Sequence, residues 1–284
     1  MKKLVLLCLI LVIYGCSSVP ITGRQQLSLV SDSEVLSLSL QEYNEYIKTA
    51  KISTDKTATS LVTNVGRKIA DAVEIYYKYM EMESLLSGYS WEFNLIEDPQ
   101  VNAFCMPGGK IVIYTGILPV TGDETGLAVV VGHEVAHAVA KHANERMSQQ
   151  MLAQYGAVGL DAILGKSSSA VKTIGQSVYG LGAQYGIMLP YNRKQELEAD
   201  HLGLVFMAIA GYNPQVALAF WERMSQQASA APEFMSTHPS DQTRIDGIKS
   251  KLPEAMEYYT SIWGNTNTNT TTQPKTNTSN EWHF

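Results

Sequence analysis

The segment that decides the fold reads DETGLAVVVGHEVAHAVAKH and covers residues 123–142. Asp123 is a good N-cap residue before a long apolar stretch, so the segment predicts a helix through His142 or beyond. His133 and His137 are four residues apart and therefore share one face of that helix. Polar side chains inside an apolar helix are costly to bury unless something pairs with them. A metal ion bound by both histidines is the partner that this spacing favours.

Zinc is the metal that suits this pattern, because it takes three or four nitrogen, oxygen or sulfur ligands. We expect one Zn²⁺ ion per chain, bound by His133 and His137. Glu134 lies one residue further round the helix, where it can accept a proton from zinc-bound water. The alternative is a hydrogen-bonded pair of core histidines without a metal.

A third protein ligand is expected from the acidic segment at residues 196–200. Glu196 and Asp200 are four residues apart and share one helix face. Glu196 is the predicted ligand, and Asp200 is predicted to accept the second ring proton of a ligand histidine, which fixes its tautomer. Glu198 is the fallback ligand, and a solvated acidic helix start is the alternative for the whole segment. His142 points to another helix face and is expected at the surface.

The rest of the chain predicts an α+β fold that is mainly helical, with a small sheet of about three strands. Ser31 with Glu34 is a capping-box pattern before a helix to about residue 49, and a second helix is expected from residue 54 or 55 to about residue 80. Strands are expected at residues 91–96, 101–106 and 110–115, with a turn at 107–109. Further helices are expected at residues 196–210, 214–227 and 240–251, and a mobile helical hairpin at 156–185.

The first residues resemble a secretory signal. Lys2 and Lys3 precede an apolar run that is too short to span a bilayer, and the run ends at Ile13-Tyr14-Gly15-Cys16, which resembles a bacterial lipobox. We expect a signal peptide at residues 1–15 and a lipid on Cys16. The alternative is an ordinary signal peptide with an incidental cysteine.

Four segments follow from these patterns. After the signal peptide we expect a lipidated linker at residues 16–30 and a zinc metallopeptidase domain at 31–260. Residues 261–284 are mostly Asn, Thr and Gln without an apolar period and predict a disordered tail.

The charge balance argues against a nucleic-acid partner. The 284 residues carry 21 Lys and Arg against 27 Asp and Glu, a formal net charge of −6, without a basic cluster. Binding to phosphates needs such a cluster. Cys105 is the one cysteine left after the signal peptide and the lipid site are set aside, and we expect it to be a small buried hydrophobe.

Several segments together resemble the zinc metallopeptidases related to the CAAX prenyl endopeptidases, in particular their soluble bacterial lipoprotein branch. The resemblance covers most of residues 16–252 and implies a gluzincin-type fold with an HExxH active-site helix. The segments that carry it are TGRQQL at residues 22–27, NAF at 102–104, PGG at 107–109, HEVAH at 133–137, ELEAD at 196–200, His238-Pro239 and Arg244-Ile245.

The resemblance also implies roles that spacing does not. Asn102, Ala103 and Phe104 would lie on or beside an edge strand that binds an extended substrate by strand addition. His238 would lie near the zinc, where the matching histidine of some relatives occupies the open coordination position and keeps the enzyme silent. Arg244 would line the cleft and stabilise developing negative charge. The alternative for His238 is a surface residue in a helix-start turn.

The expected function is that of a zinc-dependent endopeptidase in protein quality control. Its expected substrates are unfolded or misassembled cell-envelope polypeptides, including outer-membrane proteins. The lipid anchor, with serines and no Asp after Cys16, predicts a bacterial cell-envelope lipoprotein that faces the periplasm from the outer membrane. The alternatives are a non-catalytic zinc lipoprotein that acts as a holdase, and a latent protease with His238 as fourth ligand.

Overall fold

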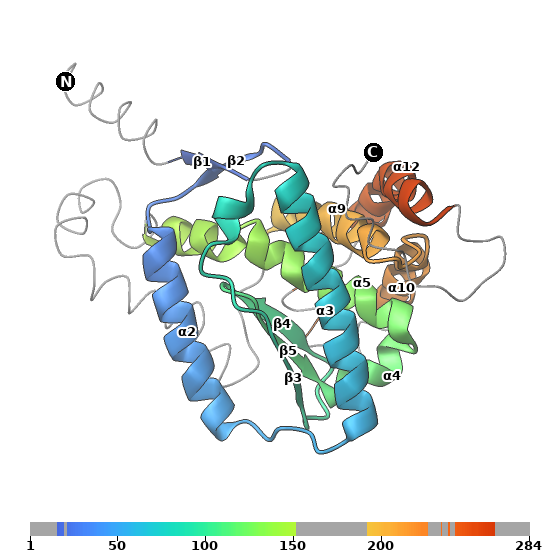
Figure 1. Ribbon diagram of the computed structural model, residues 1–284, viewed down its shortest axis with the longest axis horizontal. Helices are drawn as coiled ribbons and strands as arrows, with labels where there is room; N and C mark the ends of the chain where they lie inside the picture. The colour runs from blue at the N-terminus through green and yellow to red at the C-terminus, as the bar shows by residue number, and fades with distance from the viewer. Residues whose placement is uncertain are drawn as a thin grey trace, which may run out of the picture.

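The computed structural model describes residues 16–19, 22–151, 192–226, 234, 238 and 242–264 (Figure 1). The predicted signal peptide, the predicted helical hairpin at 156–185 and the tail after residue 264 lie outside these residues. The described part of the chain is mainly helical, with a two-stranded and a three-stranded sheet. The predicted mainly helical α+β class is confirmed.

The first two long helices begin at the predicted caps. Helix α2 (Asp32–Thr49) follows Ser31, whose side chain accepts the Glu34 N–H while the Glu34 side chain accepts the Ser31 N–H. Helix α3 (Lys56–Tyr79) follows Asp55, whose carboxylate accepts two backbone N–H groups of the first turn. In both cases a side-chain oxygen satisfies donors that the helix leaves unpaired, which fixes where the helix starts.

The central sheet has the strand order β3 (Glu92–Ile96), β5 (Lys110–Tyr114) and β4 (Ala103–Met106). Strand β3 runs parallel to β5, and β4 runs antiparallel to it, so the predicted small mixed sheet is confirmed. In the β4–β5 turn, Gly108 and Gly109 have φ values of 89° and 81°, a region that glycine adopts without steric cost. Strand β4 is an edge strand of this sheet.

Helix α5 (Glu124–Val139) is the predicted active-site helix, but it ends earlier than expected. The Asp123 carboxylate accepts the Gly126 N–H at 2.8 Å and caps its start. At the other end, Lys141 has a φ of 59°, so the chain turns and a separate helical segment follows at residues 142–151. The prediction of one helix through residue 142 is therefore wrong, because a left-handed residue breaks it.

Both faces of the central sheet are covered, as alternating strand side chains require. Ile111 and Ile113 of β5 belong to a core that they share with α3 and α5. Val112 and Tyr114 belong to a second core, which they share with α2 and the helical segment 142–151. Figure 1 shows α2 and α3 on either side of the sheet.

The long helices that the structure describes after residue 191 are α9 (Arg193–Ile209), α10 (Val216–Gln226) and α12 (Gln242–Trp263). Helix α9 starts earlier than predicted, because Asn192 and Gln195 form a capping box. Helix α12 is longer than predicted and continues through Pro253. The short elements are β1 (Cys16–Ser18), β2 (Gln25–Leu27), η1 (Glu83–Leu86), η2 (Thr115–Ile117) and α4 (Leu118–Thr121).

Two glycines let α5 and α9 approach closely. A Cβ atom added at Gly203 would lie 3.0 Å from the His133 backbone nitrogen, and one added at Gly132 would lie 3.1 Å from the Gly203 carbonyl oxygen. Larger residues would therefore push the helices apart. The crossing sets the position of the acidic residues of α9 relative to the histidines of α5.

The predicted linker contains a small hairpin in which β1 pairs antiparallel with β2. Gly23 lies in its loop with a φ of 67°, and its N–H donates to the Val19 carbonyl at 3.0 Å. Arg24, the next residue, donates to the carboxylates of Glu145 and Glu198 in the helical part of the chain.

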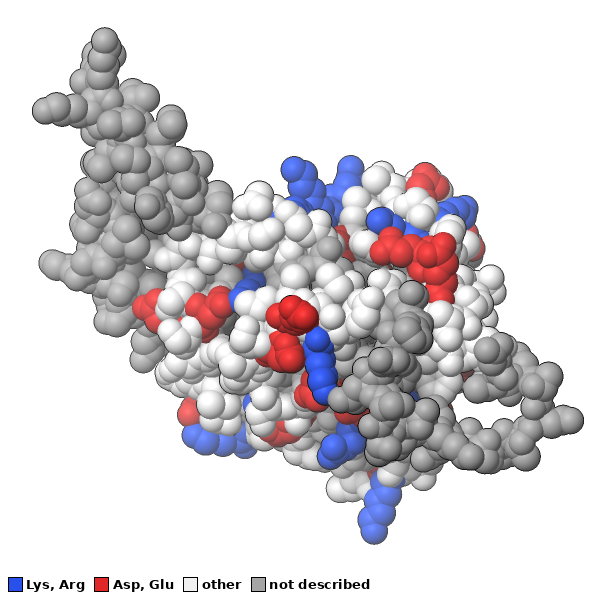
Figure 2. All heavy atoms as spheres, turned by 45° about the horizontal axis from the view of Figure 1, so that its top comes forward, with Lys and Arg blue, Asp and Glu red and all other residues white. Residues whose placement is uncertain are grey.

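None of the described helices is long and apolar enough to cross a membrane. On the face shown in Figure 2, acidic and basic side chains are interspersed among uncharged residues.

Candidate metal centre and active site

Four side chains from separate parts of the sequence meet in the core. His133 and His137 come from α5, Glu196 comes from α9, and His238 comes from the chain before α12. One ligand atom from each lies within 4.8 Å of the others, and all four residues are buried. The structure thus brings together the three predicted ligands and the histidine that the resemblance placed nearby.

The distances in this cluster fit one zinc ion. His137 Nε2 lies 3.0 Å from His133 Nε2 and 3.2 Å from Glu196 Oε1. His238 Nδ1 lies 3.2 Å from His133 Nε2 and 3.1 Å from Glu196 Oε1. Donor atoms that share a tetrahedral zinc ion with bonds of 2.0–2.2 Å lie roughly 3.3–3.6 Å apart, close to the separations seen here. Nitrogen and carboxylate donors are also those that zinc prefers, so these residues are able to hold the ion.

Glu134 lies beside the cluster with one carboxylate oxygen available. Glu134 Oε1 is 3.4 Å from His238 Nε2, and it is buried without a hydrogen-bond partner among the residues that the structure describes. The Cys105 backbone on β4 hydrogen-bonds to the same carboxylate. Burial raises the pKa of Glu134 to about 7, although His238 opposes the shift. A general base that titrates near neutral pH is well matched to its task.

His133 is held by a carboxylate and an arginine from two other helices. Its Nδ1 lies 2.9 Å from Asp200 Oδ1, so Asp200 can accept the Nδ1–H and leave the Nε2 lone pair for a metal. Arg244 of α12 donates to both oxygens of Asp200, at 2.6 and 2.8 Å. Burial first, and then the Arg244 charge, lower the pKa of His133 to about 4, which keeps the ring neutral as a ligand must be.

Arg244 is buried and lies in a carboxylate-rich environment. Its Nη1 is 2.8 Å from Glu196 Oε2, and its guanidinium lies over the Trp221 ring at 3.5 Å. Burial alone would raise the pKa of Glu196, but the Arg244 charge, together with His238, His133 and the hydrogen bond to His137, holds this pKa well below its ordinary value. The structure therefore shows Arg244 holding Glu196 and Asp200, and its contact with a reaction oxyanion stays a prediction.

His142 was expected at the surface, and this expectation is wrong. Because α5 ends before Lys141, the chain turns and directs the His142 ring into the core, where it is 0% exposed. His142 Nδ1 lies 2.7 Å from His137 Nδ1, and His142 Nε2 lies 2.9 Å from Glu198 Oε2. Sequence reasoning missed this contact, since no helical spacing connects the two histidines across the break.

Glu198 faces away from the donor cluster. Its carboxylate accepts from Arg24 Nε at 2.7 Å and from the Thr22 hydroxyl. The structure groups Glu196, and not this fallback ligand, with the histidines. The sequence offers no local signal for these contacts, because Arg24 and Glu198 are 174 positions apart.

The residues predicted to bind substrate lie at the expected edge strand. Asn102 immediately precedes β4, and its Oδ1 accepts the Ala103 N–H at 2.9 Å. The Phe104 side chain packs in the second core against Tyr46, with ring centroids 5.6 Å apart. All three residues are buried. Their contact with a substrate stays a prediction. Cys105 on the same strand is buried, as expected, and burial raises the pKa of its thiol.

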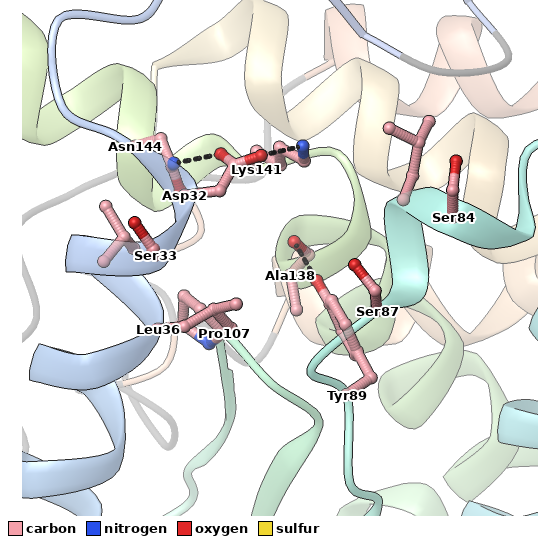
Figure 3. A pocket seen from close by; sticks show the side chains of 12 residues that line it. Asp32, Ser33, Leu36, Ser84, Ser87, Tyr89, Pro107, Ala138, Lys141 and Asn144 are labelled. Carbon is pink, nitrogen blue, oxygen red and sulfur yellow. Dashed lines mark hydrogen bonds and ion pairs between the residues drawn. The ribbon is translucent and has the colours of Figure 1, made fainter.

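A cavity of about 310 Å³ lies beyond the end of α5. Figure 3 shows it between the start of α2, the turn at Pro107 and the loop that carries Tyr89, whose hydroxyl donates to the Ala138 carbonyl at 2.8 Å. Asp32 forms an ion pair with Lys141 across one side. None of the four clustered donor residues lines this cavity, so it lies beside the metal centre and not at it.

Comparison with known proteins gives the family. A family model described as peptidase family M48 matches residues 61–252, which is more than half of the chain. The chain belongs to peptidase family M48. Members of the M48 family use zinc, so the predicted zinc cofactor and the predicted class of zinc metalloendopeptidase are confirmed by the family and by the donor cluster.

Several M48 relatives are similar over much of the chain. The mitochondrial metalloendopeptidase OMA1 of Schizosaccharomyces pombe is 39% identical over 174 residues, 60% of this chain and 49% of the relative. The mitochondrial metalloendopeptidase OMA1 of Homo sapiens is 31% identical over 250 residues, 84% and 46% of the two chains. The beta-barrel assembly-enhancing protease of Yersinia pestis is 30% identical over 176 residues, 60% and 36%. The aligned regions span about half or less of these relatives.

These relatives correct two expectations. The resemblance to zinc metallopeptidases is confirmed, but the narrower bacterial lipoprotein branch is not shown, because the OMA1 relatives are mitochondrial. The predicted location in a bacterial cell envelope is wrong by the same finding. A short basic and apolar run such as the one before Cys16 is too general a pattern to fix a compartment.

Proposed function

We propose that this chain is an endopeptidase that hydrolyses internal peptide bonds of polypeptides at the centre formed by His133, His137 and Glu196. The observation that carries the proposal is the position of Glu134. It is buried next to the donor cluster, and its Oε1 accepts no hydrogen bond from the described residues, with His238 Nε2 3.4 Å away. A purely structural zinc site has no use for an adjacent base, whereas a catalytic site needs one.

The residues of the site have different roles in the proposed hydrolysis. His133, His137 and Glu196 would hold the zinc ion, which when bound would lower the pKa of a water molecule and polarise the scissile carbonyl. Glu134 takes a proton from the attacking water and delivers it to the leaving amine. Asp200 keeps the His133 ring in the tautomer that a ligand needs.

Strand β4 is the proposed binding surface for an extended substrate. The Tyr114 N–H donates to the Asn102 carbonyl at 3.1 Å. Because backbone groups alternate in direction along an antiparallel strand, the backbone N–H and C=O of Phe104 also point toward β5. The backbone groups of Ala103 and Cys105 then point to the other edge, toward Glu134. A peptide added along this edge would pass beside the proposed base.

The test is hydrolysis of casein by the purified full chain and by its Glu134→Gln variant. The variant is expected to lose about 100- to 10,000-fold in rate while its zinc content is unchanged, because Glu134 transfers protons and is not a ligand. The control is Glu124→Gln at the partly exposed start of the same helix, which is expected to retain activity. Loss of zinc from Glu134→Gln would contradict the assigned role.

A latent enzyme is the second candidate function, and the position of His238 favours it. His238 Nδ1 is as close to His133 and Glu196 as the other donors are to one another. A histidine in the fourth position would block the attacking water until that histidine is displaced. His238→Ala is then expected to raise casein hydrolysis. Equal or lower activity would count against latency, and no cleavage by either protein would favour the non-catalytic holdase.

The proposal includes unfolded or misassembled membrane-associated proteins as substrates in quality control, and attachment to a membrane by a lipid on Cys16. The name of the related beta-barrel assembly-enhancing protease supports the substrate class. The basic and apolar run that ends at Cys16 supports the lipid. Mass spectrometry of the peptide that begins at Cys16 is expected to show the added mass of acyl chains. An unmodified Cys16 in protein extracted from a membrane would refute the lipid on this residue.

A further inference from the structure

A chain of hydrogen bonds connects the loop of the N-terminal hairpin with His137, and the mechanism above does not use it. Arg24 Nε donates to Glu198 Oε2 at 2.7 Å. The same Glu198 oxygen lies 2.9 Å from His142 Nε2, and His142 Nδ1 lies 2.7 Å from His137 Nδ1. Glu198 and His142 are buried, whereas the Arg24 side chain is 22% exposed. The series therefore leads from the surface to a proposed metal ligand.

The order of donors and acceptors along this series is fixed by chemistry. A carboxylate only accepts hydrogen bonds, so His142 Nε2 carries the proton that it shares with Glu198. In the neutral ring His142 Nδ1 is then an acceptor, and the proton between the two histidines belongs to His137 Nδ1. His137 Nε2 is left with its lone pair directed at His133 and Glu196, which is what zinc ligation requires.

Arg24 is held firmly enough to fix the orientation of Glu198. Its two terminal nitrogens donate to the two oxygens of Glu145, at 3.0 and 2.9 Å, in the paired geometry that suits arginine and a carboxylate. Gln195 also donates to Glu145 at 2.8 Å. The loop that places Arg24 depends on Gly23, whose φ of 67° other residues adopt only with strain.

We propose that Arg24, Glu198 and His142 are positioning residues for His137, acting on the metal ligand through its tautomer and ring orientation. The inference rests on the proposed function, because it concerns support for the proposed zinc centre. The loop of the N-terminal hairpin then helps to position a ligand of the proposed zinc centre.

Glu145 offers a matched control for Glu198. Both carboxylates are buried and both bind Arg24. Only Glu198 is bonded to the His142 ring. A merely structural role for the network predicts similar effects of Glu145→Gln and Glu198→Gln on the zinc centre, whereas a positioning role predicts that the two variants differ.

The first experiment measures zinc affinity by competition with a chelator in the purified full chain. Glu198→Gln is expected to weaken zinc binding about 10- to 100-fold, the usual effect of losing support behind a ligand. Glu145→Gln is expected to weaken zinc binding less than Glu198→Gln does, because Glu145 reaches Glu198 only through Arg24, whereas Glu198 bonds the His142 ring itself. Equal effects of the two variants would overturn the positioning role. Failure of the parent itself to bind zinc would instead overturn the proposed function.

The second experiment reads the tautomer directly, in zinc-free protein with ¹⁵N-labelled histidines. The parent is expected to show His137 protonated at Nδ1, and His142→Phe is expected to lose this fixed state. His137 unchanged in His142→Phe would overturn the inference. Should His142→Phe fail to fold, Arg24→Ala acts from a partly exposed position and Arg24→Lys tests recovery. Arg24→Ala is expected to weaken zinc binding, and Arg24→Lys to recover part of it. Unchanged binding in Arg24→Ala would overturn the role of Arg24.

Discussion

The two histidines of helix α5 are supported in different ways. His133 meets the carboxylate of Asp200 directly, and Arg244 holds that carboxylate from a third helix. His137 reaches its carboxylate, Glu198, only through a second histidine, and a partly exposed arginine from the N-terminal hairpin completes the series. The support of His133 therefore lies within the helical core, whereas the support of His137 also includes Arg24 of the N-terminal hairpin.

The proposed metal centre thus has two kinds of support. We call Asp200 and Arg244, behind His133, the rigid side, and Arg24, Glu198 and His142, behind His137, the adjustable side. Asp200 and Arg244 are both buried, so water and salt have little access to their interaction. Arg24 is partly exposed, so its interaction with Glu198 is more open to screening and to movement of the hairpin.

Replacing Asp200 should cost the most. Asp200→Ala leaves the Arg244 charge buried without its closest carboxylate, which typically lowers the free energy of unfolding by about 3–5 kcal/mol. Urea denaturation of the full chain measures the loss. Asp246→Ala, on the exposed side of α12, is the control and is expected to change stability by about 0.5 kcal/mol or less. Equal costs in the two variants would remove the basis for a rigid side.

Widening the crossing of α5 and α9 should have the next largest effect. A methyl group in Gly203→Ala meets the backbone of His133 at 3.0 Å, so the helices must separate at a cost of about 1–3 kcal/mol. Zinc affinity should fall as well, because Glu196 moves with α9. Gly264→Ala meets only an ordinary contact at 3.5 Å and serves as the control for thermal unfolding.

Loss of Arg24 should cost less and should depend on salt. Arg24→Ala removes bonds to two carboxylates, and we expect the free energy of unfolding to fall by about 1–2 kcal/mol. The difference from the parent should shrink at high salt, whereas the difference for Asp200→Ala should not. Denaturation of both variants at low and high salt measures this. A salt response shared by both would argue against two distinct sides.

A surface ion pair sets the lower end of the scale. Lys51 and Glu97 form a contact of 2.6 Å, with side chains 71% and 47% exposed. Lys51→Ala is expected to change the free energy of unfolding by about 1 kcal/mol at most, because solvent screens such pairs. A larger effect would mean that exposed ion pairs contribute more to the stability of this protein than the comparison of the rigid and adjustable sides assumes.

Much of the rigid side could be predicted from local sequence. Asp123 marks the start of α5, and the four-residue spacings of His133 with His137 and of Glu196 with Asp200 place side chains on common helix faces. Helix periodicity carries this information within a few residues, and a metal that needs a third ligand then connects the two helices. The capped helices α2 and α3 could be predicted for the same local reason.

The adjustable side could not be predicted this way. The break after α5 depends on a left-handed Lys141, a residue with no strong preference for that conformation, and the break decides where His142 points. The contacts of Arg24 with Glu145 and Glu198 span 121 and 174 positions, and no short-range pattern encodes them. The same limit applies to cellular location, which a short leader could not fix.

The glycine crossing of α5 and α9 also has a consequence for motion. Three of the four donor side chains come from these two helices, whose backbones touch at Gly132 and Gly203. This close packing limits how far either helix can shift relative to the other. His238 comes from outside this pair, so the crossing does not fix its position. In the proposed latent enzyme, activation would then displace one donor and leave the arrangement of the other three unchanged.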